Sequence, residues 1–456
     1  MKTKKYFQFS YLLLTSLMLI ECKSDLEETV YSASTEAGFF QGTNDVTSAL
    51  AGMYRPMQTC CGGWGQAGTM MLNGASDEGT GADFWGTYDR LDYTPSSTGE
   101  IPDWWNQSYR AIAGANLIID NQKKIEGIDD SAGKSFSKAA IGEAKFWRGL
   151  MYFQLAQMFG GVPLRTTQAK RADQTNIAKS TVDEVYAQVI ADFKDAEANL
   201  PAKPDKAKLS KWSATAYLAK VYLTRKDFPA ALAKAKEVEA SNAFSLAPKF
   251  TDVFDIEKKN GSEDIFAIQY IRVDGQGTRL DALSGWGITG VEPTLYTKFQ
   301  SSDDRVQITF IEPKNPKSNQ GKWIDPKKVS GDGQANNFIV YRYADLLLVK
   351  AEAENEVNGA TAAAYADVNK IRTRAKVPAL KAGLTKDQFR DAVLNERNLE
   401  LALEQVRWFD LKRTGRLKDV LTASGLGKWN DKYLLWPIPQ SEIDASNGLI
   451  KQNPGY

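Results

Sequence analysis

The sequence predicts a mainly α-helical protein, a scaffold of paired helices of the tetratricopeptide kind that carries loop-rich lobes and a few short β segments. Over long stretches apolar residues recur at steps of three and four, which is the period of an amphipathic helix. These stretches come in pairs joined by short breaks, and the second helix of a pair is rich in small residues. Residues 57–104 and 255–340 are instead rich in glycine, polar residues and aromatics, so we expect loops there.

The clearest helix begins after Thr181. Thr181 and Glu184 have the spacing of a capping box, in which each side chain accepts a hydrogen bond from the other residue's backbone N–H. The apolar face of this helix comprises Val182, Val185, Tyr186, Val189, Ile190, Phe193 and Ala196. The pair Leu200-Pro201 ends it.

The next two helices are predicted to form a pair. The first runs from about Ser210 to Thr224 and the second from Pro229 to Ala240, where proline suits the first helical turn. The second helix carries four alanines that let a neighbouring backbone approach closely, Ala230, Ala231, Ala233 and Ala235. The full tetratricopeptide consensus is absent, so the pattern predicts paired helices and no more.

The same design returns later in the chain. Helices are predicted over Tyr343–Val357 and Ala362–Ala375, separated by an Asn-Gly turn. Thr385, with Gln388 three residues later, caps another helix that we expect to run on to about Lys412.

The N-terminus has the form of a secretion signal, predicted over residues 1–21. Lysines precede an apolar run over residues 11–20 that is too short to span a bilayer. The run ends at Cys22 and resembles a bacterial lipoprotein signal, in which this cysteine becomes the acylated first residue and forms the lipid anchor. Glu21 stands where such signals have a small residue. Residues 22–40 are predicted to be an acidic linker, which resembles a surface-export signal but also fits an ordinary solvated linker.

The composition excludes several classes of function. The chain has 456 residues, no histidine, and 57 basic against 56 acidic residues. Without an imidazole, Ser-His-Asp catalysis, Cys-His catalysis and histidine-ligated zinc are impossible. The balanced charge gives no case for nucleic acid, and we expect no cofactor and no metal. Cys60 and Cys61 are adjacent, so they are either free thiols or a strained vicinal disulfide.

A series of motifs resembles the SusD/RagB family from the signal peptide to the C-terminus. The motifs are Trp105–Asn116, Glu143–Phe153 with its exit Phe159–Leu164, Tyr341–Leu348, Glu396–Arg413, and Leu435–Ile443 with the ending Gln452–Tyr456. Gly149 stands where the family usually has alanine, and Gln405 where it usually has glycine. Each motif alone is weakly specific, but together and in this order they are strongly so.

The resemblance implies a SusD-like surface lipoprotein that binds an oligosaccharide, catalyses nothing, and serves a SusC-like TonB-dependent transporter of the outer membrane. It also implies an N-terminal helical region over residues 41–240, with ligand loops at 57–104. A C-terminal region would follow over residues 241–456, with the loop-rich insert at 255–340.

Candidates for sugar contact lie in polar, glycine-rich surroundings. The C–H faces of a sugar pack on aromatic rings, and its hydroxyls need polar partners. The candidate residues are Trp64, Asp83, Trp85, Tyr88, Trp286 and Trp323. For each ring the alternative is packing against the scaffold. Trp105 and Trp408 have apolar neighbours at helical spacing, and we expect both in the core.

Two groups of acidic residues allow other interpretations. Glu396, Glu400 and Glu404 share one helix face, and we expect them in a partly buried ion-pair network rather than in a catalytic pair or a metal site. A loop cluster of Asp77, Glu78 and Asp83 is what a helical glycoside hydrolase would use. Such an enzyme, or a tetratricopeptide-like scaffold that binds proteins or peptides, is the alternative to glycan binding.

Overall fold

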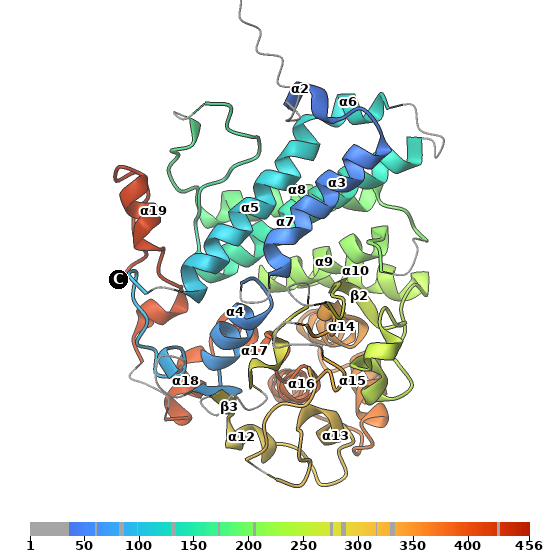
Figure 1. Ribbon diagram of the computed structural model, residues 1–456. Helices are drawn as coiled ribbons and strands as arrows, with labels where there is room; N and C mark the ends of the chain where they lie inside the picture. Colours follow the sequence, from blue (N-terminus) through green and yellow to red (C-terminus); the bar gives the residue numbers. More distant parts are fainter. Residues whose placement is uncertain are drawn as a thin grey trace, which may run out of the picture. The chain divides into compact units, whose positions relative to one another are not determined.

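Most of the chain is helical in the computed structural model of the protein (Figure 1). The structure describes residues 36–59, 62–81, 86–97, 99–128, 134–171, 174–203, 207–273, 277–283, 289–315, 317–328, 333–425 and 429–456. The helices are α2 (Glu36–Phe39), α3 (Thr43–Tyr54), α4 (Gln66–Gly68), α5 (Glu100–Asp120), α6 (Gln122–Glu126), α7 (Lys134–Phe159), α8 (Val182–Asn199), α9 (Lys211–Thr224), α10 (Phe228–Ser241), α11 (Phe250–Val253), α12 (Pro293–Tyr296), α13 (Val306–Thr309), α14 (Tyr343–Asn358), α15 (Ala362–Arg374), α16 (Lys386–Glu400), α17 (Arg407–Arg413), α18 (Leu417–Ala423) and α19 (Gln440–Ala445). The strands are β1 (Gly79–Gly81), β2 (Asp264–Ile268), β3 (Thr289–Val291) and β4 (Phe338–Arg342).

The chain divides into two units, residues 1–41 and residues 42–456. In the first unit the described part contains α2, at whose end the rings of Phe39 and Phe40 meet edge to face with 5.0 Å between centroids. The predicted signal peptide, Cys22 and most of the predicted linker lie outside the described residues, as do Cys60 and Cys61. Among the described residues, no helix has both the length and the apolar character needed to cross a bilayer.

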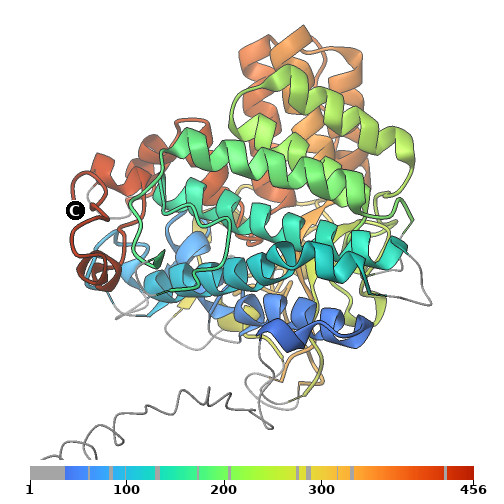
Figure 2. The same ribbon diagram turned by 90° about the horizontal axis from the view of Figure 1, so that it is seen from above.

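In the second unit the long helices stack against one another in chain order. Contacts link α3 to α5, α5 to α7, α7 to α8, α8 to α9, α9 to α10, and α10 to α14, which also packs on α15 and α16. Figure 2 shows these layers from above, from α3 at one side through α5, α7 and α8 to the C-terminal helices. The predicted mainly helical, tetratricopeptide-like scaffold is therefore confirmed. The contact between α10 and α14 also means that packing continues across the predicted region boundary near residue 240.

Local capping explains where the paired helices begin. Glu184 N donates to Thr181 Oγ1 at 3.2 Å, and Thr181 N donates to the Glu184 carboxylate at 2.7 Å, so the predicted capping box starts α8. Ser210 caps α9 in the same way. Thr385 caps α16, where Gln388 N donates to its hydroxyl at 3.3 Å. The predicted helix starts in this part of the chain agree with the structure to within one residue.

Glycines let α7 and α8 approach closely. A Cβ placed on Gly142 would lie 3.1 Å from Asn199 Cβ, and one on Gly149 would lie 3.2 Å from Asp192 Cβ. Both contacts are tighter than ordinary van der Waals distances. Gly149, which stands where the resembled family has alanine, is therefore explained by the close approach of α8.

One predicted helix is wrong in its extent. The helix that begins after Thr385 was expected to run on to about Lys412, but it stops at Glu400, and α17 begins only at Arg407. Between them Leu403 and Gln405 have positive φ angles of 63° and 61°. Right-handed helix requires negative φ, so these two residues turn the chain out of the helix axis.

Candidate functional site

The two loop-rich regions meet in a small antiparallel sheet. β1, from the first region, pairs with β3, from the second, with Gly79 opposite Val291, Thr80 opposite Gly290 and Gly81 opposite Thr289. The last residue of β1 is thus opposite the first residue of β3. Residues 82–85 and 284–288 continue the chain from this same end of the sheet.

Three of the six ligand candidates belong to those two continuations. Asp83, Trp85 and Trp286 lie outside the described residues, so their contact with a ligand stays a prediction. The described residues at their flanks are close together: a Cβ on Gly86 would lie 2.6 Å from the carbonyl oxygen of Gly81. Because Gly81 lies opposite Thr289 in the sheet, residues more than 200 positions apart in the chain lie side by side at this end.

Polar groups hold the same end of the sheet. The buried carboxylate of Asp89 accepts hydrogen bonds from Thr80 Oγ1 and from Gly81 N, both at 2.9 Å. Arg90 is exposed and forms an ion pair with Asp92 at 3.2 Å. The sheet end is thus fixed by a buried acid, while charged groups beside it remain in solvent.

The other three candidates are buried. Trp64 and Trp323 are each 2% exposed, and Tyr88 is 3% exposed. Trp64 stacks on Phe338 with 6.2 Å between ring centroids, and Trp323 Nε1 donates to Leu403 O at 3.2 Å. Tyr88 OH donates to Glu100 at 2.8 Å. Packing against the scaffold, the alternative that the sequence allowed, accounts for these three rings, because none of them offers a free face to a sugar.

The turn between α16 and α17, residues 401–406, fastens both loop regions to the scaffold. Leu403 N donates to Glu78 at 3.0 Å, and Gln405 N donates to Asn73 at 3.2 Å. The Gln405 amide also donates to Trp64 O at 2.9 Å and to Thr69 Oγ1 at 3.1 Å. The anchor was missed at the sequence level, because the predicted continuous helix hid this turn.

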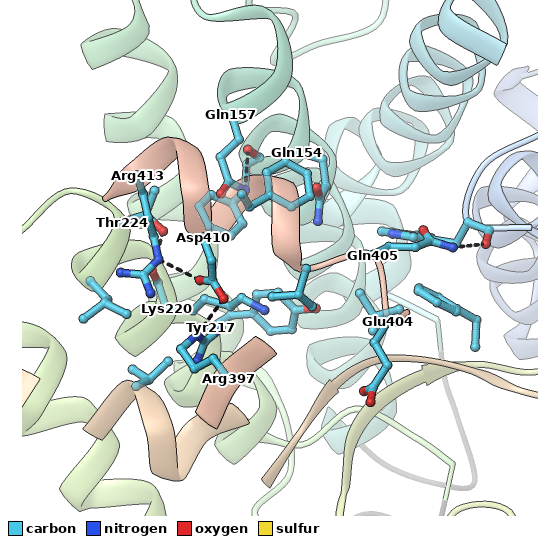
Figure 3. A pocket seen from close by; sticks show the side chains of 18 residues that line it. Gln154, Gln157, Tyr217, Lys220, Thr224, Arg397, Glu404, Gln405, Asp410 and Arg413 are labelled. Atoms are coloured by element: carbon cyan, nitrogen blue, oxygen red, sulfur yellow. Dashed lines mark hydrogen bonds and ion pairs between the residues drawn. The ribbon is translucent and has the colours of Figure 1, made fainter. Parts of the chain in front are cut away.

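Figure 3 shows Gln405 of this turn together with Asp410 of α17. Gln405 points away from Asp410, which lies between Arg397 and Arg413 at 2.7 and 2.9 Å. The hollow that these residues surround measures about 40 Å³. That volume holds one or two water molecules, so it is far too small for a sugar ring and is part of the polar interior.

Asp77 and Glu78 also bond inward. The Asp77 carboxylate lies 2.7 Å from Arg407 and 2.6 Å from Lys298. Burial alone would raise the pKa of Asp77, but the bonds and charges of Arg407 and Lys298 lower it to about 2. Burial, and then the charge of Asp77, raise the pKa of Glu78 to about 8. At neutral pH Asp77 is therefore ionised and Glu78 is protonated, and the hydrogen bonds of both side chains hold the loop.

The three glutamates of α16 and its following turn lie in the expected ion-pair network. Arg305 reaches Glu396 at 2.6 Å, and Arg342 reaches Glu400 at 2.6 Å and Glu404 at 2.7 Å. All of these side chains are nearly inaccessible to solvent. Burial disfavours the charge of Glu400, but the surrounding arginines outweigh it and lower the pKa of this carboxyl. The prediction of a buried ion-pair network is confirmed, and Trp105 and Trp408, at 2% and 1% exposure, are in the core as expected.

Comparison with known proteins relates the chain to one family. A sequence pattern described as the SusD family matches residues 295–456, and one described as starch-binding associating with outer membrane matches residues 26–223. SusD-like protein P2 of Formosa agariphila is 30% identical, over 99% of this chain and 100% of the relative.

Solved structures are similar over nearly the whole chain. A laminarin binding SusD-like protein is 25% identical, with a TM-score of 0.79 over 91% of this chain and 100% of that one. A SusD homolog from Bacteroides thetaiotaomicron is 21% identical, with a TM-score of 0.81 over 92% of this chain and 98% of that one. The latter similarity supports the fold alone.

Proposed function

The chain belongs to the SusD/RagB family, and on that premise we propose that it is a non-catalytic glycan-binding protein of the cell surface. The observation that carries the proposal is the meeting of the two loop-rich regions at one end of the β1–β3 sheet. In the sequence Asp83 and Trp85 closely follow β1, and Trp286 closely precedes β3. Two tryptophans and an acid on adjoining loops have the chemistry that a sugar needs, rings for its C–H faces and polar groups for its hydroxyls.

The anchoring of the loops supports binding. Glu78, Asn73 and Trp64 are each bonded to the turn 401–406, and Asp77 is bonded to Arg407 just beyond it. A rigid base lowers the entropy lost when a ligand orders the loops above it. The inward polar contacts of Asn73, Asp77 and Glu78 thus support the loops and do not themselves contact a ligand.

The placement of the acids argues against hydrolysis. A glycoside hydrolase needs two carboxyl groups roughly 5–10 Å apart across the sugar-binding cleft. Of the loop cluster that the sequence offered, Asp77 is ion-paired and Glu78 is fully buried against the scaffold. Asp83 alone would remain to face a sugar, and the chain has no histidine to act with it.

We place the protein at the outer membrane, anchored by acyl chains on Cys22, where it hands oligosaccharide to a SusC-like TonB-dependent transporter. The starch-binding pattern that matches residues 26–223 is described as associating with the outer membrane, which supports this location. Replacing Cys22 by alanine should move the protein from the membrane fraction to the soluble fraction. Unchanged membrane association of that variant would refute the anchor.

Affinity electrophoresis through native gels that contain laminarin or starch tests the proposal. We expect one of these glycans to retard the wild-type protein. Trp85→Ala or Trp286→Ala should weaken binding by roughly 5- to 150-fold, the effect of losing roughly 1–3 kcal/mol of aromatic contact. Trp429→Ala is the matched control, because Trp429 is a partly exposed tryptophan whose indole N–H donates to Asp431 at 2.8 Å and whose ring contacts Tyr433.

Three results would contradict the proposal. Release of reducing ends by the purified protein would indicate a hydrolase. Capture of peptides with no retardation on either glycan would indicate a protein-binding scaffold. Equal binding by the loop variants and the Trp429 control would remove Trp85 and Trp286 from the site.

A further inference from the structure

An open pocket of about 560 Å³ lies where the start of α9, the end of α10 and the start of β2 meet. It shares no lining residue with β1, β3 or the turn 401–406. Its volume falls in the range of small-molecule sites, roughly 300–1,000 Å³. The walls that matter for recognition are formed by Trp212, Phe244, Asn242, Asn260 and Asp264.

Trp212 differs from the other tryptophans that the structure describes. Seven of them are at most 2% exposed: Trp64, Trp104, Trp105, Trp147, Trp323, Trp408 and Trp436. Trp212 and Trp429 are partly exposed, and Trp212 lines this pocket. Lys211 Nζ lies 4.4 Å from the centroid of the Trp212 ring, so a sugar would stack on the ring face opposite Lys211. Phe244 is partly exposed as well. Apolar rings of this size are usually buried, so two of them in one open pocket need an explanation.

Polar groups surround these rings. Asn242 and Asn260 both have left-handed backbones, with φ of 53° and 58°, a conformation that asparagine tolerates better than most residues. Asn260 Oδ1 accepts from Gln269 Nε2 at 2.9 Å and from Asn337 Nδ2 at 3.4 Å. Asp264 accepts backbone hydrogen bonds from Gly261 N, at 3.2 Å, and from Asn260. Burial, and then the charge of Glu263, raise the pKa of Asp264 to about 7, so near neutral pH it can donate as well as accept.

Hydrogen bonds between the walls hold the pocket open in one shape. Ser213 Oγ donates to Ile265 O at 2.9 Å and ties α9 to β2. Ser245 N donates to Ser262 O at 2.9 Å and ties the segment after α10 to the turn before β2. A pocket whose walls are already joined costs a ligand little ordering entropy.

We propose that this pocket is a second carbohydrate subsite, which binds a neutral sugar unit by stacking on Trp212 and Phe244. The hydroxyls of the sugar bond Asp264, Asn242 and Asn260. The pocket wall also includes Lys203 and Lys208, so it carries charges of both signs together with flat rings and amide groups. Such a mixed wall suits a neutral, hydroxyl-rich ligand. This inference rests on the proposed function, and it gives the protein a second contact with the same or a neighbouring glycan chain. Two weak contacts on one polysaccharide raise the overall affinity through their effective concentration.

The test uses the full chain and the glycan, laminarin or starch, that retards the wild-type protein. In the Trp85→Ala, Trp286→Ala double variant, adding Trp212→Ala should lower the residual affinity by about tenfold. Adding Trp429→Ala instead should leave it unchanged. Hydrogen exchange on the wild-type protein provides a second readout: the glycan should slow exchange in residues 241–247 and 258–270.

The outcomes separate this inference from the proposed function. If wild-type protein is retarded but residues 241–247 show no protection and Trp212→Ala matches Trp429→Ala, the second subsite is wrong and glycan binding stands. If neither glycan retards the wild-type protein, both are overturned. Should Trp212→Ala fail to fold, as a lowered melting temperature against the Trp429 variant would reveal, Phe244→Ala replaces it with the same expected loss.

Discussion

Gln405 offers a test of how the loop anchor works, because its backbone conformation destabilises the fold while its side-chain hydrogen bonds stabilise it. Its φ of 61° is left-handed, which favours glycine. Its buried side-chain amide donates to Trp64 O at 2.9 Å and to Thr69 Oγ1 at 3.1 Å, which favours glutamine. Gln405→Gly and Gln405→Ala separate the two effects, since both remove the amide and only one retains a Cβ.

The magnitudes follow from the contacts. A left-handed residue with a Cβ costs roughly 1–2 kcal/mol, and glycine loses roughly 0.5–1 kcal/mol more backbone entropy on folding. The backbone at position 405 therefore favours glycine over alanine by about 0.5–1 kcal/mol. Loss of the two hydrogen bonds costs about 2 kcal/mol, because the Trp64 carbonyl loses a buried donor. We expect Gln405→Ala to lose about 2 kcal/mol of unfolding free energy and Gln405→Gly about 1 kcal/mol.

Urea denaturation followed by circular dichroism measures these losses. Lys226 is the matched control, since it has a φ of 62° and is exposed at the end of α9. Lys226→Gly should stabilise the protein slightly and Lys226→Ala should leave it unchanged, because only the backbone effect operates there. The reasoning is refuted if Gln405→Ala is as stable as Gln405→Gly, or if either variant equals the wild type. Loosening of the anchor should also speed hydrogen exchange in residues 62–78.

Three further predictions concern the scaffold. The folded-state pKa of Glu78 is raised to about 8, so its stabilising contribution is complete below the unfolded pKa, near 4–5, and is lost as the pH rises through 8. Glu78→Gln should remove this loss of unfolding free energy in denaturation curves taken from about pH 6 to about pH 9. The same pH dependence in the variant and the wild type would contradict the assignment. Arg342→Met should cost roughly 3 kcal/mol of unfolding free energy, because it removes one buried cation from Glu400 and Glu404, which keep only Arg305, Arg374 and Lys322. A neutral effect in urea denaturation would show that the remaining cations suffice. Trp408→Ala should lower the melting temperature strongly, because it removes a ring that is 1% exposed. Trp429→Ala should leave the melting temperature nearly unchanged. Equal melting temperatures of the two variants would place Trp408 outside the core.

Much of the scaffold could be predicted because its signals are local. Thr181 and Glu184 are three residues apart, and their mutual hydrogen bonds start α8 whatever the rest of the chain does. The ion-pair prediction for Glu396, Glu400 and Glu404 likewise needed only their helical spacing and the cost of burying unpaired charge.

The candidate ligand site was less predictable from the sequence than the scaffold. Trp64 and Trp323 have glycine-rich neighbours in sequence, yet both pack in the core against Phe338, which lies far from Trp64 in the chain.

The amino-acid sequence by itself determined the helices, their pairing and the order of the motifs, because capping, periodicity and composition act over a few residues. Tertiary structure alone decided that the helix after Thr385 breaks at residues 401–406, and that this turn holds the loop regions. It also decided that Gly81 lies opposite Thr289, and which tryptophans are covered. The physical reason is distance along the chain. A strand pair or a buried ring is stabilised by partners hundreds of residues away, and no local pattern records where those partners will be.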